Sequence, residues 1–327
     1  MTKEEINDVV RLFKKLAILA ALLFVLDRGI GMFLDYRYNK NPPPDVQAFN
    51  RVIKTPSEDI FVFGSSKAAH GYVSDVFSDS LGLTCFNAGR EKTNILYANV
   101  VMTEMLKKHS PKIIILDINA KETVATSMEA SKLVLANLLM PYITKDTSIE
   151  HLGKKLFPKE VLTSELSELQ RFNSQILPLL MGTGKESRVS QNGYIPAHGS
   201  KVLGDLPSFE DRGEQYDTAA KTYFEDFIIA LQAKNVKLYV VQSPYLVKKF
   251  TTSVSLAELK PIMQKHNVEF LDYSFDTAFF KREYFYDYVH LNDKGAHAFS
   301  ERLASDIKKD LEKTDPALLN KLQTVER

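Results

Sequence analysis

The chain has 327 residues, enough for one large domain or two of average size. Hydrophobic residues make up 44% and charged residues 25%, so most of the chain is expected to be globular. The formal net charge of +1 gives no electrostatic reason to expect a nucleic-acid partner. The single cysteine, Cys85, excludes an internal disulfide and a zinc-type cysteine cluster.

The first forty residues contain an uninterrupted apolar run, 16–26, which follows two lysines and precedes Asp27 and Arg28. As a helix this run spans about 16 Å, against a hydrocarbon core of about 30 Å. Extending it to membrane length in either direction takes in charged side chains. We therefore expect a marginal transmembrane anchor within residues 1–40, with a cleaved signal peptide or a buried amphipathic helix as alternatives.

The lysine pair before the apolar run favours an N-terminus in the cytoplasm. On that basis we expect a single-pass protein of the cytoplasmic membrane, with its main domain on the extracytoplasmic (periplasmic) side. Residues 41–56 are interpreted as a linker, because three prolines after Asn41 are typical of a stiff extended spacer. Residues 314–327 are predicted to be a C-terminal tail.

Between residues 57 and 313 the chain alternates strand-like and helix-like segments, which predicts a parallel sheet with right-handed crossovers. The predicted strands are 60–64, 84–88, 112–118, 237–241 and 268–272, and helical patterns lie between them. The fold class is therefore α/β, with a three-layer flavodoxin-like core. The stretch 119–214 shows helical spacing and no convincing strand. It is predicted to be a helical insertion between strands three and four, which either shapes a pocket or only covers the sheet.

The first predicted strand ends in Gly64-Ser65-Ser66. Its apolar run is typical of a strand buried on both faces. Open α/β sheets bind ligands at the carboxyl ends of their strands, and in a flavodoxin-like sheet the switch point lies beside the first strand. We therefore predict that Ser66 is a nucleophile. The alternative is a Gly-Ser turn with capping serines.

Asp287 and His290 follow the fifth predicted strand, three residues apart. A carboxylate on one ring nitrogen of a histidine fixes the tautomer, so that the other nitrogen can take a proton from a serine. The alternative is that both residues cap the last helix. Because Ser66 and this pair follow strands of one parallel sheet, we expect all three at the same edge.

These segments resemble the SGNH, or GDSL-type, hydrolase superfamily over roughly residues 57–313, less the insertion. Phe63-Gly64-Ser65-Ser66 matches the strand-Gly-Asp-Ser motif, with Ser65 where Asp is usual. Gly89 matches the glycine after strand two, and Asp287 to His290 matches the D-x-x-H motif. The G-x-N-D motif is poorly kept, since Leu116-Asp117-Ile118-Asn119 lacks its glycine.

The resemblance implies a role for each matched residue. Ser66 would be the nucleophile, His290 the base and Asp287 its orienting carboxylate. The oxyanion hole would consist of the backbone N–H groups of Ser66 and Gly89, with the Asn119 amide as third donor. No cofactor and no metal are implied.

The anchor and the Gly-Ser-Ser variant are most similar to envelope-linked members of the superfamily. These include the D-alanyl transfer protein of teichoic acid modification and the acetyltransferases of exopolysaccharides. The resemblance implies a membrane-anchored serine esterase or O-acyltransferase, that is, a carbohydrate esterase or O-acetyltransferase. Its substrate would be an acylated cell-envelope glycan or a small ester, and a membrane-bound acyltransferase is a candidate partner.

Two other functions stay open at this point. The missing G-x-N-D motif is consistent with a catalytically silent accessory protein that binds a membrane acyltransferase or a polysaccharide. A flavodoxin-like nucleotide binder is disfavoured, because a phosphate loop at 64–69 would contain a single glycine.

Three further side chains near the predicted nucleophile or in the insertion have two interpretations each. His70, four residues after Ser66, is predicted to contact substrate, with a polar role at a helix end as the alternative. Tyr194 is predicted to line the pocket or else to pack. Lys67 is expected to attract anions or to be solvated.

Overall fold

The computed structural model describes residues 2–181, 192–209, 215–250 and 254–316. Its contacts divide the chain into two compact units, one of residues 1–46 and 135–186 and the other of residues 47–134 and 187–327. Part of the predicted insertion is therefore grouped with the N-terminal segment, not with the predicted domain 57–313. The predicted tail, 314–327, lies outside the described residues from position 317 onward.

A five-stranded parallel sheet forms the centre of the second unit, which confirms the predicted α/β fold. The strands are β1 (Ile60–Phe63), β2 (Cys85–Asn87), β3 (Ile113–Asp117), β5 (Lys237–Gln242) and β7 (Glu269–Asp272). Their order is β2-β1-β3-β5-β7, and every neighbouring pair is parallel. The order reverses beside β1, so the end of β1 lies at the switch point where such sheets bind ligands.

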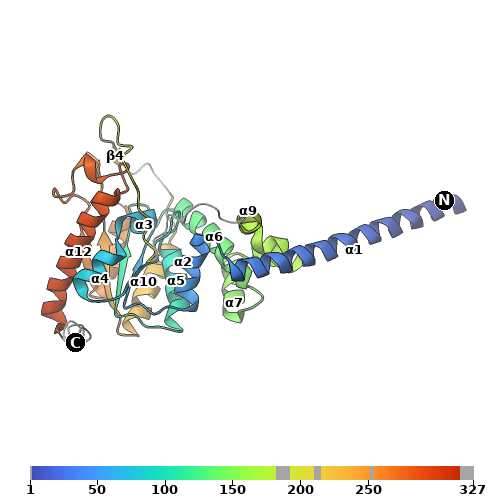
Figure 1. The fold of residues 1–327 in the computed structure, drawn as a ribbon, viewed down its shortest axis with the longest axis horizontal. Helices are drawn as coiled ribbons and strands as arrows, with labels where there is room; N and C mark the ends of the chain where they lie inside the picture. The colour runs from blue at the N-terminus through green and yellow to red at the C-terminus, as the bar shows by residue number, and fades with distance from the viewer. Residues whose placement is uncertain (1, 182–191, 210–214, 251–253, 317–327) are drawn as a thin grey trace. The chain divides into compact units, whose positions relative to one another are not determined.

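Helices cover both faces of this sheet (Figure 1). On one face α3 (Ser66–Gly71), α4 (Ser74–Leu81) and α12 (Asp293–Thr314) share a core with Ile60 and Val62 of β1. On the other face lie α5 (Ile95–Leu106) and α10 (Ala219–Gln232), where the Phe63 ring centroid is 6.2 Å from that of Phe227. Alternate residues of β1 therefore face two different cores, which explains its unbroken apolar run.

The predicted insertion, 119–214, is helical over most of its described length. It contains α6 (Ala125–Leu139), α7 (Thr147–Leu156), α8 (Pro158–Leu166), α9 (Ile176–Met181) and the 3-10 segments η1 (Met140–Tyr142) and η2 (Leu169–Gln175). The expectation of no strand is wrong at one place, where β4 (Ser208–Phe209) pairs in parallel with β6 (Lys249–Phe250). Two residues are too few to produce a recognisable strand pattern. After this pair, α11 (Val254–Lys265) leads to β7.

The predicted linker, 41–56, contains the eleven-residue helix α2 (Pro44–Lys54). Val46, Phe49 and Val52 are buried at the three-residue spacing of a helical face. The extended segment predicted at the prolines therefore ends at Pro44, the first residue of α2, and most of the predicted linker is helical. The reason is that the apolar periodicity after the prolines determines the local structure.

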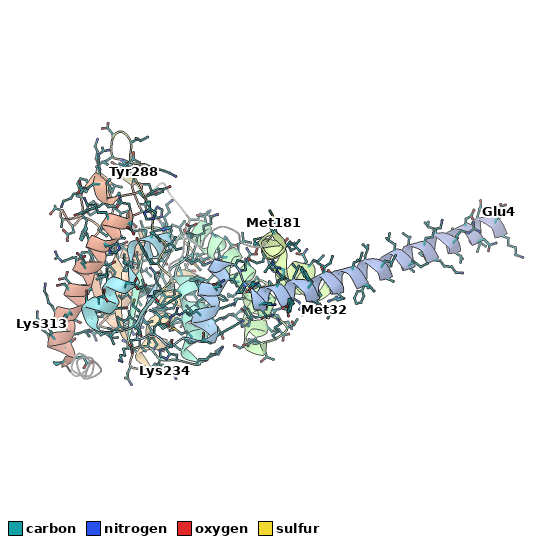
Figure 2. All side chains as sticks on the ribbon, viewed as in Figure 1. Glu4, Met32, Met181, Lys234, Tyr288 and Lys313 are labelled. Atoms are coloured by element: carbon teal, nitrogen blue, oxygen red, sulfur yellow. The ribbon has the colours of Figure 1, made fainter. Side chains whose placement is uncertain are left out.

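The N-terminal segment forms a single 38-residue helix, α1 (Lys3–Lys40). Figure 2 shows its side chains between Glu4 and Met32 projecting away from the helix along its length. Near its C-terminal end Tyr38 is buried between the rings of Tyr142 and Phe172. In the part of the chain that the structure describes, no helix combines the length and the hydropathy needed to cross a membrane.

The charged pair after the apolar run of α1 is bound within the first unit. The Asp27 carboxylate accepts hydrogen bonds from the Ser167 hydroxyl (2.5 Å) and the Glu168 backbone N–H (2.9 Å). Arg28 forms an ion pair with the Glu168 carboxylate at 2.8 Å. The pair thus attaches α1 to the segment between α8 and η2.

Candidate active site

Ser66 lies where β1 passes into α3. Gly64 makes the turn with a φ of +146°, and Ser66 is the first residue of α3. A Cβ on Gly64 would lie 2.7 Å from the backbone oxygen of Asp117. Both the backbone angle and the close approach of β3 therefore require glycine. The turn places the serine at the carboxyl edge of the sheet, as predicted.

Asp287 and His290 lie in the loop between η3 (Arg282–Tyr284) and α12. The loop is closed by an antiparallel bridge between Phe285 and Leu291. Inside it, Oδ1 of Asp287 accepts hydrogen bonds from the backbone N–H groups of Val289 and His290, both at 2.8 Å. The carboxylate therefore shapes the loop that carries the histidine.

The capping alternative for Asp287 is excluded by the start of α12. The cap of that helix is Asn292, whose Oδ1 accepts a hydrogen bond from the Gly295 N–H at 3.0 Å. Ser65 occupies the cap position of α3 but makes no side-chain cap bond. The capping interpretation of the two serines is therefore not what the structure shows either.

Ser66, His290 and Asp287 form one chain of hydrogen bonds. Ser66 Oγ lies 2.8 Å from Nε2 of His290, and Nδ1 of His290 lies 2.9 Å and 3.0 Å from the two carboxylate oxygens of Asp287. Because an ionised carboxylate only accepts, Nδ1 carries the hydrogen, and Nε2 of the neutral ring accepts the serine hydroxyl. Sequence reasoning thus selected three residues that the fold brings together.

The charge on Asp287 is maintained by its partners. Burial by itself would raise the pKa of this carboxyl, but hydrogen bonds from the His290 ring and the Val289 and His290 N–H groups lower it to about 2. Asp287 is therefore ionised at neutral pH and holds the imidazole in one tautomer. Both side chains are partly exposed, so a substrate can reach the histidine from solvent.

Two predicted oxyanion donors lie in the turn region. Ser66 is the first residue of α3, where the helix supplies no acceptor for its backbone N–H. Gly89 packs directly against α3, since a Cβ there would lie 2.6 Å from the Ala69 nitrogen. The Gly89 N–H, however, donates to the Asn87 Oδ1 at 2.9 Å.

The third predicted donor, Asn119, is bound to a neighbouring acid. Its Nδ2 donates to Glu122 Oε2 at 2.8 Å, and its backbone N–H donates to the same oxygen at 3.1 Å. Glu122 is buried, and burial raises its pKa to about 8, although the backbone N–H groups of Asn119 and Ile95 oppose the shift. The structure therefore places the Asn119 amide on Glu122.

His70 lies beside the histidine of the hydrogen-bonded chain. The two ring centroids are 5.8 Å apart and the rings are nearly perpendicular. Nδ1 of His70 is 2.7 Å from the backbone oxygen of Ile195 and therefore carries a hydrogen, while Nε2 is 3.1 Å from a Glu91 carboxylate oxygen. His70 thus lies next to His290, and its contact with substrate stays a prediction.

Tyr194 has a different environment from the one expected of a pocket residue. Its ring belongs to the buried core under α12, and its hydroxyl donates to the Asp293 carboxylate at 2.8 Å. Burial and this carboxylate raise the pKa of Tyr194. The placement favours packing, the alternative interpretation of this residue.

Lys67 differs from both expectations for an exposed lysine, because its side chain is only 4% exposed. The acidic residue with the largest electrostatic influence on it is Asp117, the last residue of β3. A signal for this site exists in the sequence: Asp117 is an acidic residue within a strand predicted to be buried on both faces. The pairing itself requires knowledge of the strand order.

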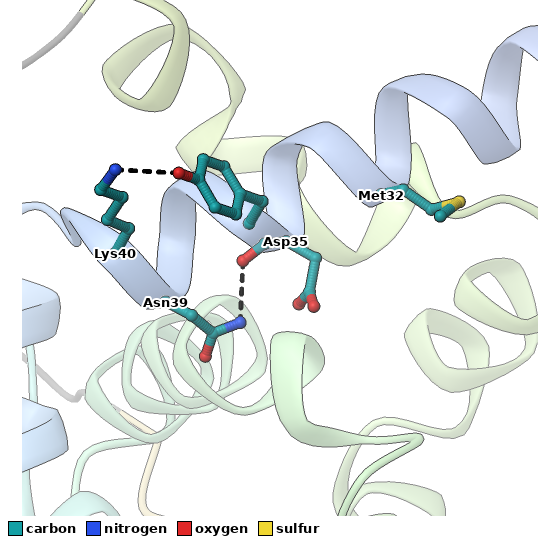
Figure 3. A pocket seen from close by; sticks show the side chains of 5 residues that line it. Met32, Asp35, Asn39 and Lys40 are labelled. Atoms are coloured by element: carbon teal, nitrogen blue, oxygen red, sulfur yellow. Dashed lines mark hydrogen bonds between the residues drawn. The ribbon is translucent and has the colours of Figure 1, made fainter.

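Within the described ranges no group of three or more His, Cys, Asp or Glu side chains could hold a metal ion. A surface hollow in the first unit is lined by Met32, Asp35, Tyr36, Asn39 and Lys40, all on α1 (Figure 3). Its polar end is organised by a hydrogen bond from Lys40 Nζ to the Tyr36 hydroxyl at 2.9 Å. None of the predicted site residues lines this hollow.

No protein-family profile and no curated relative matches the sequence. Among solved structures, the chain is similar to the psychrotrophic esterase EstA of Pseudoalteromonas sp. at 10% identity. The TM-score is 0.42, over 77% of this chain and 98% of that one. It is also similar to the lipase/acylhydrolase of Enterococcus faecalis, at 11% identity and a TM-score of 0.37, over 77% of this chain and 95% of that one. The function is therefore inferred from the geometry of the site.

Proposed function

We propose that the protein is an SGNH-type serine esterase or O-acyltransferase that acts on an acylated cell-envelope glycan. The observation that carries the proposal is the continuous hydrogen-bonded chain from Ser66 Oγ through His290 to the Asp287 carboxylate. A serine, a histidine and a carboxylate in this order are the arrangement used for nucleophilic acyl transfer on several unrelated folds.

Each residue has a defined part in the reaction. Ser66 Oγ attacks the ester carbonyl carbon while its proton moves to Nε2 of His290, and Asp287 stabilises the imidazolium that forms. When the tetrahedral intermediate collapses, the bond to the leaving alkoxide breaks and that oxygen takes the proton from Nε2. The acyl-serine is then attacked by water or by a sugar hydroxyl, whose proton passes to His290, and Ser66 is regenerated.

The oxyanion hole sets the expected rate. Loss of one preorganised donor typically costs about 3 kcal/mol of transition-state stabilisation. With the Asn119 amide bound to Glu122 and the Gly89 N–H bound to Asn87, the intermediate relies on the backbone N–H of Ser66. We therefore expect a slow enzyme on simple esters.

The same observation supports a second candidate, a catalytically silent accessory protein that binds a polysaccharide or a membrane acyltransferase.

The test is covalent labelling of the full-length protein in detergent with a fluorophosphonate probe, together with hydrolysis of p-nitrophenyl acetate. We expect labelling of Ser66 and measurable hydrolysis, and loss of both in Ser66→Ala. Ser65→Ala is the matched control, because Ser65 is the adjacent serine and makes no side-chain cap bond. A wild-type protein that neither reacts nor hydrolyses would favour the accessory function. Equal activity of wild type and Ser66→Ala would overturn the proposed nucleophile.

We further propose that α1 anchors the protein to the cytoplasmic membrane, with the second unit on the extracytoplasmic side. The support is the apolar run 16–26, in which Leu22 is 57% exposed, and the lysine pair before it. The charged pair that follows the run is bound to the first unit through Ser167 and Glu168. Residues up to Leu26 are thus left for contact with lipid.

The absence of tryptophan allows a direct measurement of this contact. In Leu22→Trp the single tryptophan is expected to be quenched when the protein is reconstituted in vesicles of brominated phosphatidylglycerol and phosphatidylethanolamine. Phe275→Trp is the control, since Phe275 is similarly exposed, at 49%, but lies in the second unit. Equal quenching of the two variants would contradict anchoring through α1.

A further inference from the structure

Lys67 directly follows the proposed nucleophile, yet its side chain points into the protein. Its Nζ donates to the backbone oxygens of Ser243 at 2.9 Å and Pro244 at 3.2 Å. It also lies 3.0 Å from the ring centroid of Tyr245. The ammonium group therefore has two carbonyl acceptors and an aromatic face. All three partners belong to the loop that directly follows β5.

The Asp117 carboxyl acts on this lysine electrostatically, and within the described residues neither of its oxygens has a hydrogen-bond partner. Asp117 is the last residue of β3, is 0% exposed, and its backbone oxygen approaches the Gly64 turn most closely. Burial raises the pKa of Asp117 and lowers that of Lys67, and the charge of each group opposes the shift of the other. A buried charge without such compensation would be strongly destabilising.

The surroundings of the two groups come from three elements. Besides Tyr245, the hydroxyls of Tyr72 in the residue after α3 and of Ser243 after β5 act on the Asp117 carboxyl, although neither hydroxyl forms a hydrogen bond with it. Asp272 at the end of β7 adds a second negative charge that acts on Lys67. The cluster thus lies at the carboxyl ends of β3, β5 and β7 and at the end of α3.

We propose that Lys67 holds the nucleophile turn against the loop after β5 through its bonds to the Ser243 and Pro244 carbonyls, and that the buried Asp117 carboxyl stabilises the charge of the lysine. Lys67 is then a positioning residue for Ser66. The sheet order β1-β3-β5 places the turn, the acid and the carbonyl acceptors at the ends of three adjacent strands. This inference rests on the proposed function, because it concerns the reactivity of Ser66.

The energetics of buried charges indicate that Lys67 and Asp117 position the nucleophile turn and add little to the stability of the fold. Replacing a buried ion pair by uncharged side chains of similar volume is often neutral or stabilising. A lysine and an aspartate at these positions therefore contribute little that apolar residues could not. If the turn were displaced, Ser66 Oγ would lose its 2.8 Å contact with Nε2 of His290. Small displacements of a nucleophile strongly reduce the rate of the chemical step.

The deciding variant is Lys67→Met combined with Asp117→Asn in the full-length protein, which removes both charges and retains similar volumes. We expect a melting temperature close to that of wild type and fluorophosphonate labelling of Ser66 at least ten-fold slower. With p-nitrophenyl acetate, kcat is expected to fall by the same factor, while KM changes less than two-fold because Lys67 touches no substrate.

Lys67→Met alone is expected to label at least as slowly as the double variant and to melt at a lower temperature, because Asp117 is left without its partner. Lys108→Met is the matched control: Lys108 also donates to a backbone carbonyl, that of Ile53 at 2.7 Å, but is not part of the site. It is expected to label at the wild-type rate.

A double variant that is stable and labels at the wild-type rate would overturn the proposal, since the two charges would then only compensate each other. If the double variant does not fold, Asp117→Asn decides: slower labelling supports the proposal and wild-type labelling overturns it. Absence of labelling in the wild type would instead refute the proposed function, and this inference with it. The two failures are therefore distinguishable.

Discussion

Two regions of this molecule depart from the usual rule that ionisable side chains are exposed and apolar side chains are buried. One region buries ionisable groups, and the other exposes apolar ones. At the carboxyl edge of the sheet, Lys67, Asp117 and Glu122 carry ionisable groups in the protein interior. Along α1, apolar side chains such as Leu22 and Phe24 are more than half exposed. Ionisable side chains are rarely fully buried without partners, and contiguous exposed apolar surface usually marks a contact site.

The difference between the two regions lies in where the compensation comes from. Lys67 and Glu122 are hydrogen-bonded within the second unit, to the loop after β5 and to Asn119 respectively. The apolar side chains of the N-terminal part of α1 are compensated, in our proposal, by lipid. In our proposals, the first region positions the nucleophile Ser66, and the second places the protein at a membrane.

The largest effect on activity is expected when the two histidines of the site are replaced one at a time. Both lie beside a carboxylate, but only His290 contacts Ser66 Oγ. We expect His290→Ala to lower kcat for p-nitrophenyl acetate by about 10³-fold or more, since the proton acceptor is lost. His70→Ala should lower kcat less than about ten-fold, because its ring contacts the Ile195 carbonyl and Glu91. Equal losses would show that His70 shares the role of base.

A second prediction concerns the buried acid Glu122, whose pKa is raised from 4.5 to about 8. In the unfolded chain the carboxyl ionises above about pH 4.5, whereas in the folded protein it stays protonated up to about pH 8. Its contribution to stability is therefore complete below about pH 4.5 and is lost as the pH rises through about 8.

The measurement is the free energy of unfolding of wild type and Glu122→Gln as a function of pH. The glutamine does not titrate and still offers an oxygen to Asn119. We expect the wild-type value, relative to the variant, to fall by about 5 kcal/mol between about pH 4 and pH 9, since one pKa unit corresponds to about 1.36 kcal/mol. A constant difference across this range would contradict the raised pKa.

The smallest effect is expected at the end of the exposed run of α1. Asp27→Ala removes the acceptor of the Ser167 hydroxyl and of the Glu168 and Leu169 N–H groups, a loss of about 1 kcal/mol for a capping interaction. Hydrogen exchange at Glu168 and Leu169 should become several-fold faster. Asp27→Asn is the control, because asparagine caps about as well as aspartate. Unchanged exchange in Asp27→Ala would show that the attachment of α1 relies on other contacts.

The sequence by itself determined the five strands of the sheet and the three residues that meet at its edge. Strands buried on both faces need unbroken apolar runs, so 60–64 and 112–118 are visible without any tertiary information. Ser66, Asp287 and His290 follow from local motifs and from one topological rule, that parallel strands end at a common edge. Those features depend on residues that are close in sequence or on a property that all such sheets share.

Only the tertiary structure decided the partners of the remaining groups. Periodicity shows that a residue such as Asp117 is buried, but the identity of its partner depends on which strand lies beside β3. The same holds for Asn119, whose amide is bound to Glu122, and for residues 135–186, which join α1 in one unit. The physical reason is that a pattern in sequence reports how much of a side chain is covered, whereas the covering element comes from elsewhere in the chain.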